Sequence, residues 1–220
     1  MARELPYIAA INEAIHLEMA RDESVLFFGQ NMATTENEPF VDAFGRDRVR
    51  VTPISETAEI GIAVGAALAG YRPVVELYMA EFMLVAMDQV VNEAPRFRYM
   101  SGGKVKVPVV LKAGYGFTAG WAGQHTGTIY GMFMGVPGLK VAVPATAACI
   151  SARTSSAIRS ASSGASTPSS TSRARKRGTG SPRSAASYSS GAPNFSTASC
   201  SGKCSGTPGG AMMLPWAESR

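Results

Sequence analysis

Residues 1–147 of this 220-residue chain contain no cysteine and only three serines, whereas residues 148–220 hold all three cysteines and 20 serines. The lack of cysteine excludes disulfides, thiolate catalysis and cysteine-ligated metal sites from the first part. No run approaches the roughly 18 apolar residues of a membrane-spanning helix. The N-terminal segment has charges and no continuous apolar region, unlike a secretory signal. We therefore expect a cytoplasmic protein without a membrane partner.

Acidic residues are almost missing from the second part of the chain. Residues 1–147 have 15 acidic and 12 basic side chains, a net charge of −3, whereas residues 148–220 have nine basic side chains and one acid, a net charge of +8. The overall charge of +5 and the pI near 9.3 thus come from residues 148–220 alone. We interpret the RARKR run at 173–177 as a solvated charge cluster, so nucleic acid is not an expected partner.

Short apolar runs alternate with helical periodicity through the first part of the chain. Residues 6–20 have apolar side chains at helical spacing, and the VLFFG run at 25–29 is typical of a buried strand that ends at glycine. The pattern predicts further strands at 49–55, 72–78, 105–114 and 139–145, and helices at 40–44, 58–70, 82–100 (interrupted at Pro95) and 129–134. This alternation predicts an α/β fold, a parallel sheet with helices on both faces.

Residues 148–220 lose this periodicity. Their Ser, Ala, Gly, Arg and Pro content is typical of a low-complexity, disordered tail, apart from a short helical pattern at 155–160. The Cys200–Cys204 pair has no second pair and no nearby histidine, so it does not predict a zinc site. The sequence therefore predicts a folded domain at 1–147 and a tail at 148–220. The abrupt change suggests a shifted reading frame near codon 148.

Several motifs follow one another in the order that one enzyme family has. They are TPISETAEIGIAVGAALAGYRPVVE (52–76), AMDQVVNEAPRFRYMSGG (86–103), GQHTG (123–127) and VPGLKVAVPATA (136–147). Together they closely resemble the beta subunit of the thiamine-diphosphate-dependent 2-oxo acid dehydrogenases of the pyruvate dehydrogenase type, over essentially all of residues 5–147. The resemblance implies a transketolase-like pyrimidine-binding domain, which is an α/β sandwich with a parallel sheet.

The resemblance assigns roles to three side chains. Glu56, in the I-S-E motif, matches the carboxylate that bonds the cofactor's aminopyrimidine ring and so creates an internal base. A glutamate at a helix start also interacts with the helix dipole. Phe82 matches the aromatic residue that packs against the same ring, and a place in the core is compatible with that role. His125, in GQHTG, matches the histidine that exchanges protons at the active site.

The chain departs from the family pattern at two places. Residues 29–31 are Gly-Gln-Asn where the family has Gly-Glu-Asp or Gly-Glu-Glu, so acidic side chains near the cofactor are lost. The resemblance also implies a potassium ion held by carbonyls near Val109, Ala157 and Ile158. Ser160 stands where an aspartate is expected, which disfavours that ion.

The sequence has no Gly-Asp-Gly magnesium motif, no P-loop and no GxGxxG motif. In the family an alpha subunit holds the magnesium and the diphosphate of thiamine diphosphate. The resemblance therefore implies an alpha subunit as partner in a heterotetramer, with a dihydrolipoyl acyltransferase core as a further partner. The family's C-terminal domain is also expected to be missing.

The expected function is oxidative decarboxylation of pyruvate or a related 2-oxo acid, with acyl transfer to lipoamide. Branched-chain 2-oxo acids and acetoin are alternative substrates, because one beta subunit does not settle the choice. A transketolase-like enzyme and a truncated, non-catalytic remnant of the subunit are the alternative identities.

Overall fold

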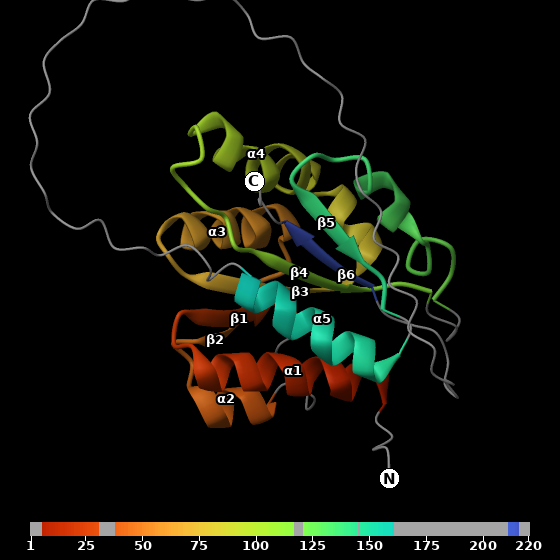
Figure 1. The fold of residues 1–220 in the computed structure, drawn as a ribbon. Helices are drawn as coiled ribbons and strands as arrows, with labels where there is room; N and C mark the ends of the chain where they lie inside the picture. The colour runs from red at the N-terminus through yellow and green to blue at the C-terminus, as the bar shows by residue number, and fades with distance from the viewer. Residues whose placement is uncertain (1–5, 31–37, 117–120, 145, 161–210, 216–220) are drawn as a thin grey trace, which may run out of the picture.

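The strands of this chain form a single twisted sheet at the centre of the molecule (Figure 1). The computed structural model describes residues 6–30, 38–116, 121–144, 146–160 and 211–215. The strand order is β2-β1-β3-β4-β6-β5. The strands are β1 (Val25–Gly29), β2 (Val49–Val51), β3 (Arg72–Met79), β4 (Val110–Gly114), β5 (Leu139–Ala142) and β6 (Ala211–Pro215). The first four are parallel neighbours, while β6 runs antiparallel between β4 and β5.

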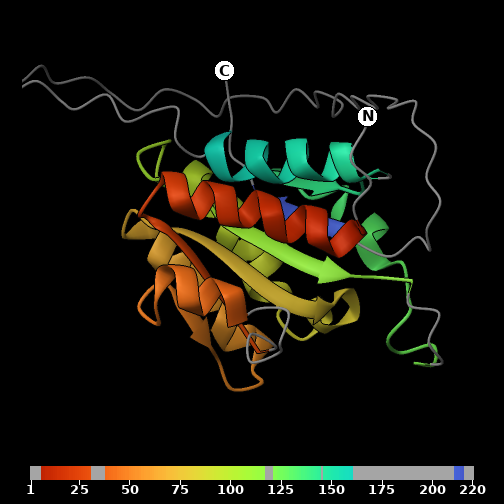
Figure 2. The same cartoon turned by 90° about the horizontal axis from the view of Figure 1, so that it is seen from below.

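Helices cover both faces of the sheet (Figures 1 and 2). On one face α1 (Tyr7–Arg21) and α5 (Ala147–Ser160) lie side by side, with α2 (Glu38–Phe44) beside α1 and β2. The other face carries α3 (Glu56–Leu68), the 3₁₀ helix η1 (Ala80–Leu84), the π-helical η2 (Asp88–Glu93), α4 (Ala94–Met100) and the 3₁₀ helix η3 (Ile129–Phe133). The predicted α/β fold is confirmed. No helix in the described part of the chain is long and apolar enough to cross a bilayer.

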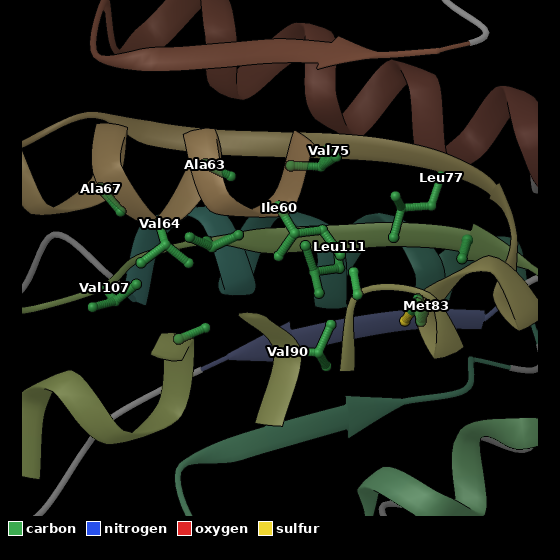
Figure 3. Packing of buried hydrophobic residues seen from close by; sticks show 14 of the residues in the cluster. Ile60, Ala63, Val64, Ala67, Val75, Leu77, Met83, Val90, Val107 and Leu111 are labelled. Atoms are coloured by element: carbon green, nitrogen blue, oxygen red, sulfur yellow. The ribbon is translucent and has the colours of Figure 1, made fainter. Parts of the chain in front are cut away.

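The central strands contribute side chains to two separate cores. In β1, Phe27 packs into the core under α1, while its neighbour Phe28 packs into the core under α3. The second core is drawn in Figure 3, where Ile60 of α3 meets Leu77 of β3 and Leu111 of β4. Both faces of the strands are therefore buried. This is why the strand sequences are continuous apolar runs without alternation.

Residues 80–100 form three helical segments, where the sequence predicted one long helix at 82–100. A 3₁₀ turn, a π-helical stretch and a short α-helix follow one another as η1, η2 and α4. Pro95 lies in the first turn of α4, where its missing N–H leaves no hydrogen bond unmade. The proline therefore begins a helix, and the predicted interruption falls at the junction of η2 and α4.

The folded part of the chain extends beyond the predicted boundary at residue 147. α5 packs along α1, which confirms the helical pattern at 155–160 and shows that the described fold includes residues that the sequence placed in the tail. Arg72 of β3 donates a hydrogen bond to the Ile158 carbonyl at 2.9 Å, and Arg159 pairs with the buried Glu18 of α1 at 3.3 Å. β6 is a second ordered element inside the predicted tail, and the remainder of that tail lies outside the described residues.

A buried ion pair crosses the middle of the sheet. Glu76 of β3 and Lys112 of β4 are direct cross-strand neighbours, each less than a tenth exposed, and the lysine Nζ bonds the carboxylate. Gly29 of β1 lies opposite Glu76, and a Cβ on that glycine would come within 2.2 Å of the Glu76 carbonyl oxygen. Because both charged groups are buried away from water, the attraction between them is needed to offset the hydration that each has lost.

Replacing Lys112 with methionine should destabilise the domain by about 3–5 kcal/mol, since the Glu76 carboxylate would remain buried without a counter-charge. The free energy of unfolding in urea at neutral pH measures the effect. The double variant Glu76→Gln/Lys112→Met should recover most of the loss, because it removes both charges. If the double variant were as unstable as the single one, charge pairing would not be the reason for the loss.

Candidate active site

The predicted site residues Glu56, Phe82 and His125 all lie in connections that follow the carboxyl ends of parallel strands. Glu56 comes after β2, Phe82 after β3, and His125 in the connection that leaves β4. Gln30 comes directly after β1. Since β1 to β4 are parallel, these connections emerge at one edge of the sheet. In open parallel sheets this edge is where ligands bind.

Glu56 is the first residue of α3, and its side chain is buried. Gln30 donates a hydrogen bond from Nε2 to Glu56 Oε1 at 3.0 Å. A carboxylate in the first turn of a helix is also stabilised by the helix dipole, so the structural interpretation of this residue fits its position, and the functional one stays a prediction. The amide of Gln30 supplies a donor at a place where an acid would bring a second negative charge.

The turn that carries Glu56 is fixed to the segment that carries Phe82. Thr57 Oγ1 donates a hydrogen bond to the Val85 carbonyl at 3.1 Å. The Val85 N–H in turn bonds the Phe82 carbonyl at 3.2 Å. The start of α3 and η1 are therefore neighbours, and the partly buried Phe82 ring belongs to the same edge as Glu56.

Phe82 and His125 are in direct contact. Their ring centroids are 5.6 Å apart and their planes make an angle of 86°, an edge-to-face arrangement. His125 Nδ1 lies 3.1 Å from the Trp121 carbonyl oxygen. With Nδ1 donating to that carbonyl, Nε2 is the ring nitrogen left for a ligand. The structure thus brings together two of the residues that the sequence singled out.

The end of β3 has a backbone conformation that the sequence did not reveal. Tyr78 has a φ of +58°, and the pairing of β3 with β4 changes register between Glu76 and Met79. A left-handed conformation at a residue other than glycine costs on the order of 1–3 kcal/mol, and such residues concentrate at functional sites. The kink leads the chain into η1 and brings the Tyr78 ring to 5.6 Å from that of Trp121.

Sequence reasoning missed a second buried carboxyl group in α3. Glu59 lies one turn after Glu56 and is only 1% exposed. Its Oε1 accepts a hydrogen bond from Thr52 Oγ1 at 2.7 Å, while its buried Oε2 has no partner among the described residues. Burial raises the pKa of Glu59, helped by the negative charge of Glu56, and hydrogen bonds from Thr52 and Ser55 offset part of the rise. A glutamate within the apolar run AEIGIAVG was the available signal.

The potassium ion that the resemblance implies at the carbonyls near Val109, Ala157 and Ile158 stays a prediction. Val109 belongs to the core under α3, whereas Ala157 and Ile158 belong to the core under α1. The Ile158 carbonyl already accepts a hydrogen bond from the positively charged Arg72. Within the described ranges no cluster of three or more His, Cys, Asp or Glu side chains could hold a metal, which concerns side-chain ligands and not carbonyls.

The fold and these side chains define a class of protein. It is a parallel α/β domain that presents a buried glutamate, an aromatic ring and a histidine at the carboxyl edge of its sheet, as domains that bind small organic ligands do. The chain belongs to the family described as "Transketolase, pyrimidine binding domain", whose model matches residues 3–167. The family resemblance seen in the sequence is confirmed.

Curated relatives of the chain are beta subunits of an oxidoreductase and of dehydrogenases. The chain is 44% identical over 164 residues to the acetoin:2,6-dichlorophenolindophenol oxidoreductase subunit beta of Cupriavidus necator, covering 66% of this chain and 47% of that protein. It is 38% identical over 151 residues to the pyruvate dehydrogenase E1 component subunit beta-2 of Oryza sativa, covering 66% and 40%. It is 35% identical over 147 residues to the 2-oxoisovalerate dehydrogenase subunit beta of Bacillus subtilis, covering 64% and 45%. The chain thus spans less than half the length of each.

A solved structure described as a split gene transketolase in an inactive beta4 tetramer has a similar fold. Its TM-score to this chain is 0.56 at 16% sequence identity, over 71% of this chain and 49% of that one. At this low identity the likeness supports the fold alone.

Replacing Glu59 with glutamine should stabilise the domain at neutral pH and have little effect in acid. Because the pKa of Glu59 is raised from its ordinary 4.5, the folded state holds this proton more tightly than the unfolded state does. The contribution of Glu59 is therefore fully present below about pH 4.5 and is lost as the pH rises through the folded-state pKa. Glutamine, which does not titrate, avoids that loss.

Urea unfolding of both chains at about pH 4 and about pH 8 measures this difference. Glu23→Gln, which removes an exposed carboxylate, is the matched control measured under the same conditions. A stability difference between Glu59→Gln and the unaltered chain that is the same at both pH values would contradict the assignment.

Proposed function

We propose that this chain is the cofactor-activating half of the beta subunit of a thiamine-diphosphate-dependent 2-oxo acid dehydrogenase. The reaction is oxidative decarboxylation of pyruvate or a related 2-oxo acid, with acyl transfer to lipoamide on an acyltransferase core. The observation that carries the proposal is the buried Glu56 carboxylate, at the start of a helix that is hydrogen-bonded to the segment bearing Phe82. The partner is an alpha subunit that holds magnesium and diphosphate, since the sequence has no motif for either.

The described residues fit the pyrimidine end of the cofactor. Glu56 has one hydrogen bond among them, from the uncharged Gln30 to Oε1, so Oε2 can accept a proton or hydrogen bond from a ring nitrogen. The Phe82 ring is only partly buried and offers a flat apolar surface to a flat heterocycle. When bound, thiamine diphosphate supplies a carbon nucleophile and an electron sink for decarboxylation.

Each side chain has a distinct task in this proposal. Glu56 holds the ring nitrogen through a charge-assisted hydrogen bond, and Gln30 orients Glu56 without adding charge. His125 gives or takes a proton at the substrate oxygen through Nε2, because Nδ1 is directed to the Trp121 carbonyl. Phe82 holds the imidazole edge-on and keeps water from that side of the ring.

A second candidate function is the cleavage of acetoin. The relative with 44% identity is named for acetoin, whereas the pyruvate dehydrogenase subunit of Oryza sativa is 38% identical. The same carboxylate, aromatic ring and histidine would serve that reaction, with a hydroxyketone in place of the 2-oxo acid. Parallel assays of the assembled enzyme with pyruvate, branched-chain 2-oxo acids and acetoin distinguish the candidates.

Glu56→Gln in the full chain, assembled with an alpha subunit, should lower turnover by at least about 100-fold, because a glutamine cannot stabilise a protonated ring nitrogen. The affinity for the cofactor should fall much less, since diphosphate contacts on the alpha subunit carry much of the binding. Steady-state rates and cofactor titration measure the two effects. Glu23→Gln, an exposed position before β1 at the opposite edge of the sheet, is the control. Near-normal turnover in Glu56→Gln would remove this residue from the mechanism.

The chain without an alpha subunit should neither bind thiamine diphosphate detectably nor turn over pyruvate, and it should self-associate. Ile54, Ile62 and Val85, in and beside the first half of α3, are each more than half exposed, and apolar surface of this kind drives association. Calorimetry with cofactor and magnesium, beside light scattering, measures both properties. A monomer with micromolar cofactor affinity would contradict the prediction. An assembled but inactive enzyme would favour the non-catalytic remnant.

A further inference from the structure

Glu81 links two segments of the candidate site that are far apart in the sequence. It belongs to η1, directly before Phe82, and its Oε1 accepts a hydrogen bond from the backbone N–H of Gly127 in the GQHTG segment. A hydrogen bond to a charged acceptor is stronger than one between neutral groups. The other carboxylate oxygen, Oε2, is buried and has no partner within the described residues. Burying a carboxylate oxygen without a hydrogen-bond partner costs free energy, so the position of Glu81 calls for an explanation.

Gly127 is shaped to receive that carboxylate. A Cβ at this position would lie 2.7 Å from Glu81 Oε1 and 3.4 Å from the carboxyl carbon. Gly127 is not among the glycines with positive φ, so its backbone conformation is open to other residues. A residue with a Cβ at 127 would therefore displace the Glu81 carboxylate from its present position.

The turn that bears His125 is closed by bonds of its own. The His125 N–H and Thr126 Oγ1 both donate to the Ala122 carbonyl, at 3.3 and 2.9 Å, and Ala122 has a φ of +61°. These local bonds set the shape of the turn and leave its position against η1 undetermined. The bond from Gly127 to Glu81 supplies that position, two residues after His125.

We propose that Glu81 is a positioning residue that anchors the GQHTG segment, so that the His125 imidazole stays edge-on to Phe82 where a substrate would meet it. The structural role of Glu81 is argued from the contacts described above, and its effect on turnover rests on the proposed function. Glu81, which binds Gly127, and Phe82, whose ring contacts His125, are adjacent in sequence. One short 3₁₀ helix therefore carries both the residue that holds the GQHTG segment and the ring that the histidine contacts.

The first measurement is independent of activity. In the full chain assembled with an alpha subunit, Glu81→Leu should speed amide hydrogen exchange in the peptide around 121–130 by at least about tenfold, because the Gly127 N–H loses its acceptor. Glu81→Gln keeps an acceptor oxygen and should restore most of the protection. Leu84→Ala, at an exposed position of the same helix, should leave the exchange unchanged. Unchanged exchange in Glu81→Leu would overturn the proposal.

A second set of variants tests the contact without relying on the leucine substitution. Gly127→Ala places a methyl group against the Glu81 carboxylate and should loosen the same peptide, while Glu81→Ser/Gly127→Ala should be less perturbed than the two single changes predict together. Strict additivity would overturn the contact, even if Glu81→Leu failed to fold.

Turnover then separates the anchor from the proposed function. If His125 acts on the substrate, Glu81→Leu should lower kcat on the order of 100-fold with little change in KM, as a displacement of about 1 Å can do, and Glu81→Gln should recover most of it. Faster exchange with unchanged kcat would support the anchor and count against the role of His125. Loss of kcat with unchanged exchange would overturn the anchor and leave the proposed function standing.

Discussion

Four neighbouring parallel strands, β2, β1, β3 and β4, must each be followed by a connection that returns the chain to the same starting edge. That requirement places helices on both faces, where they bury the continuous apolar runs of the strands. It also makes every connection after a strand emerge at the opposite edge. Gln30, Glu56, Phe82 and His125 are neighbours for this reason, although 95 residues separate the first from the last. The site is a consequence of strand direction before any side chain is considered.

Strand direction alone places these connections only coarsely, and hydrogen bonds between the connections complete the arrangement. Thr57 ties the start of α3 to η1, Gln30 ties the end of β1 to Glu56, and Glu81 ties η1 to the GQHTG segment. Each bond joins two different connections, so none of them is supplied by the sheet ladder. Mutations that leave the core and the strand pairing intact can therefore still displace the site.

The alternation of strands and helices could be predicted because each element depends on a short continuous stretch of sequence. The motifs also selected Phe82 and His125, which the structure brings into contact, while the roles of Glu56, Phe82 and His125 stay predictions. The left-handed Tyr78 could not be predicted, since neither glycine nor asparagine marks it. The docking of α5 was hidden by its serine-rich composition, because long-range bonds such as Arg72 to Ile158 help to hold it. β6 pairs with strands about 70 and 100 residues earlier in the chain, which local periodicity cannot reveal.

Three acids of the described domain are buried near the carboxyl edge, and their partners differ in a way that selects one of them. Glu76 is neutralised by Lys112, and burial raises the pKa of Glu59, which favours its neutral form. Glu56 accepts a hydrogen bond from the neutral amide of Gln30 and forms no ion pair within the described ranges. An acid at position 30 would compete with Glu56 for the same cationic or N–H ligand. Of the three acids, Glu56 is the one that lies in the first turn of a helix with a neutral side-chain amide as its partner, which is the arrangement that the proposed hydrogen bond to a ligand ring nitrogen requires.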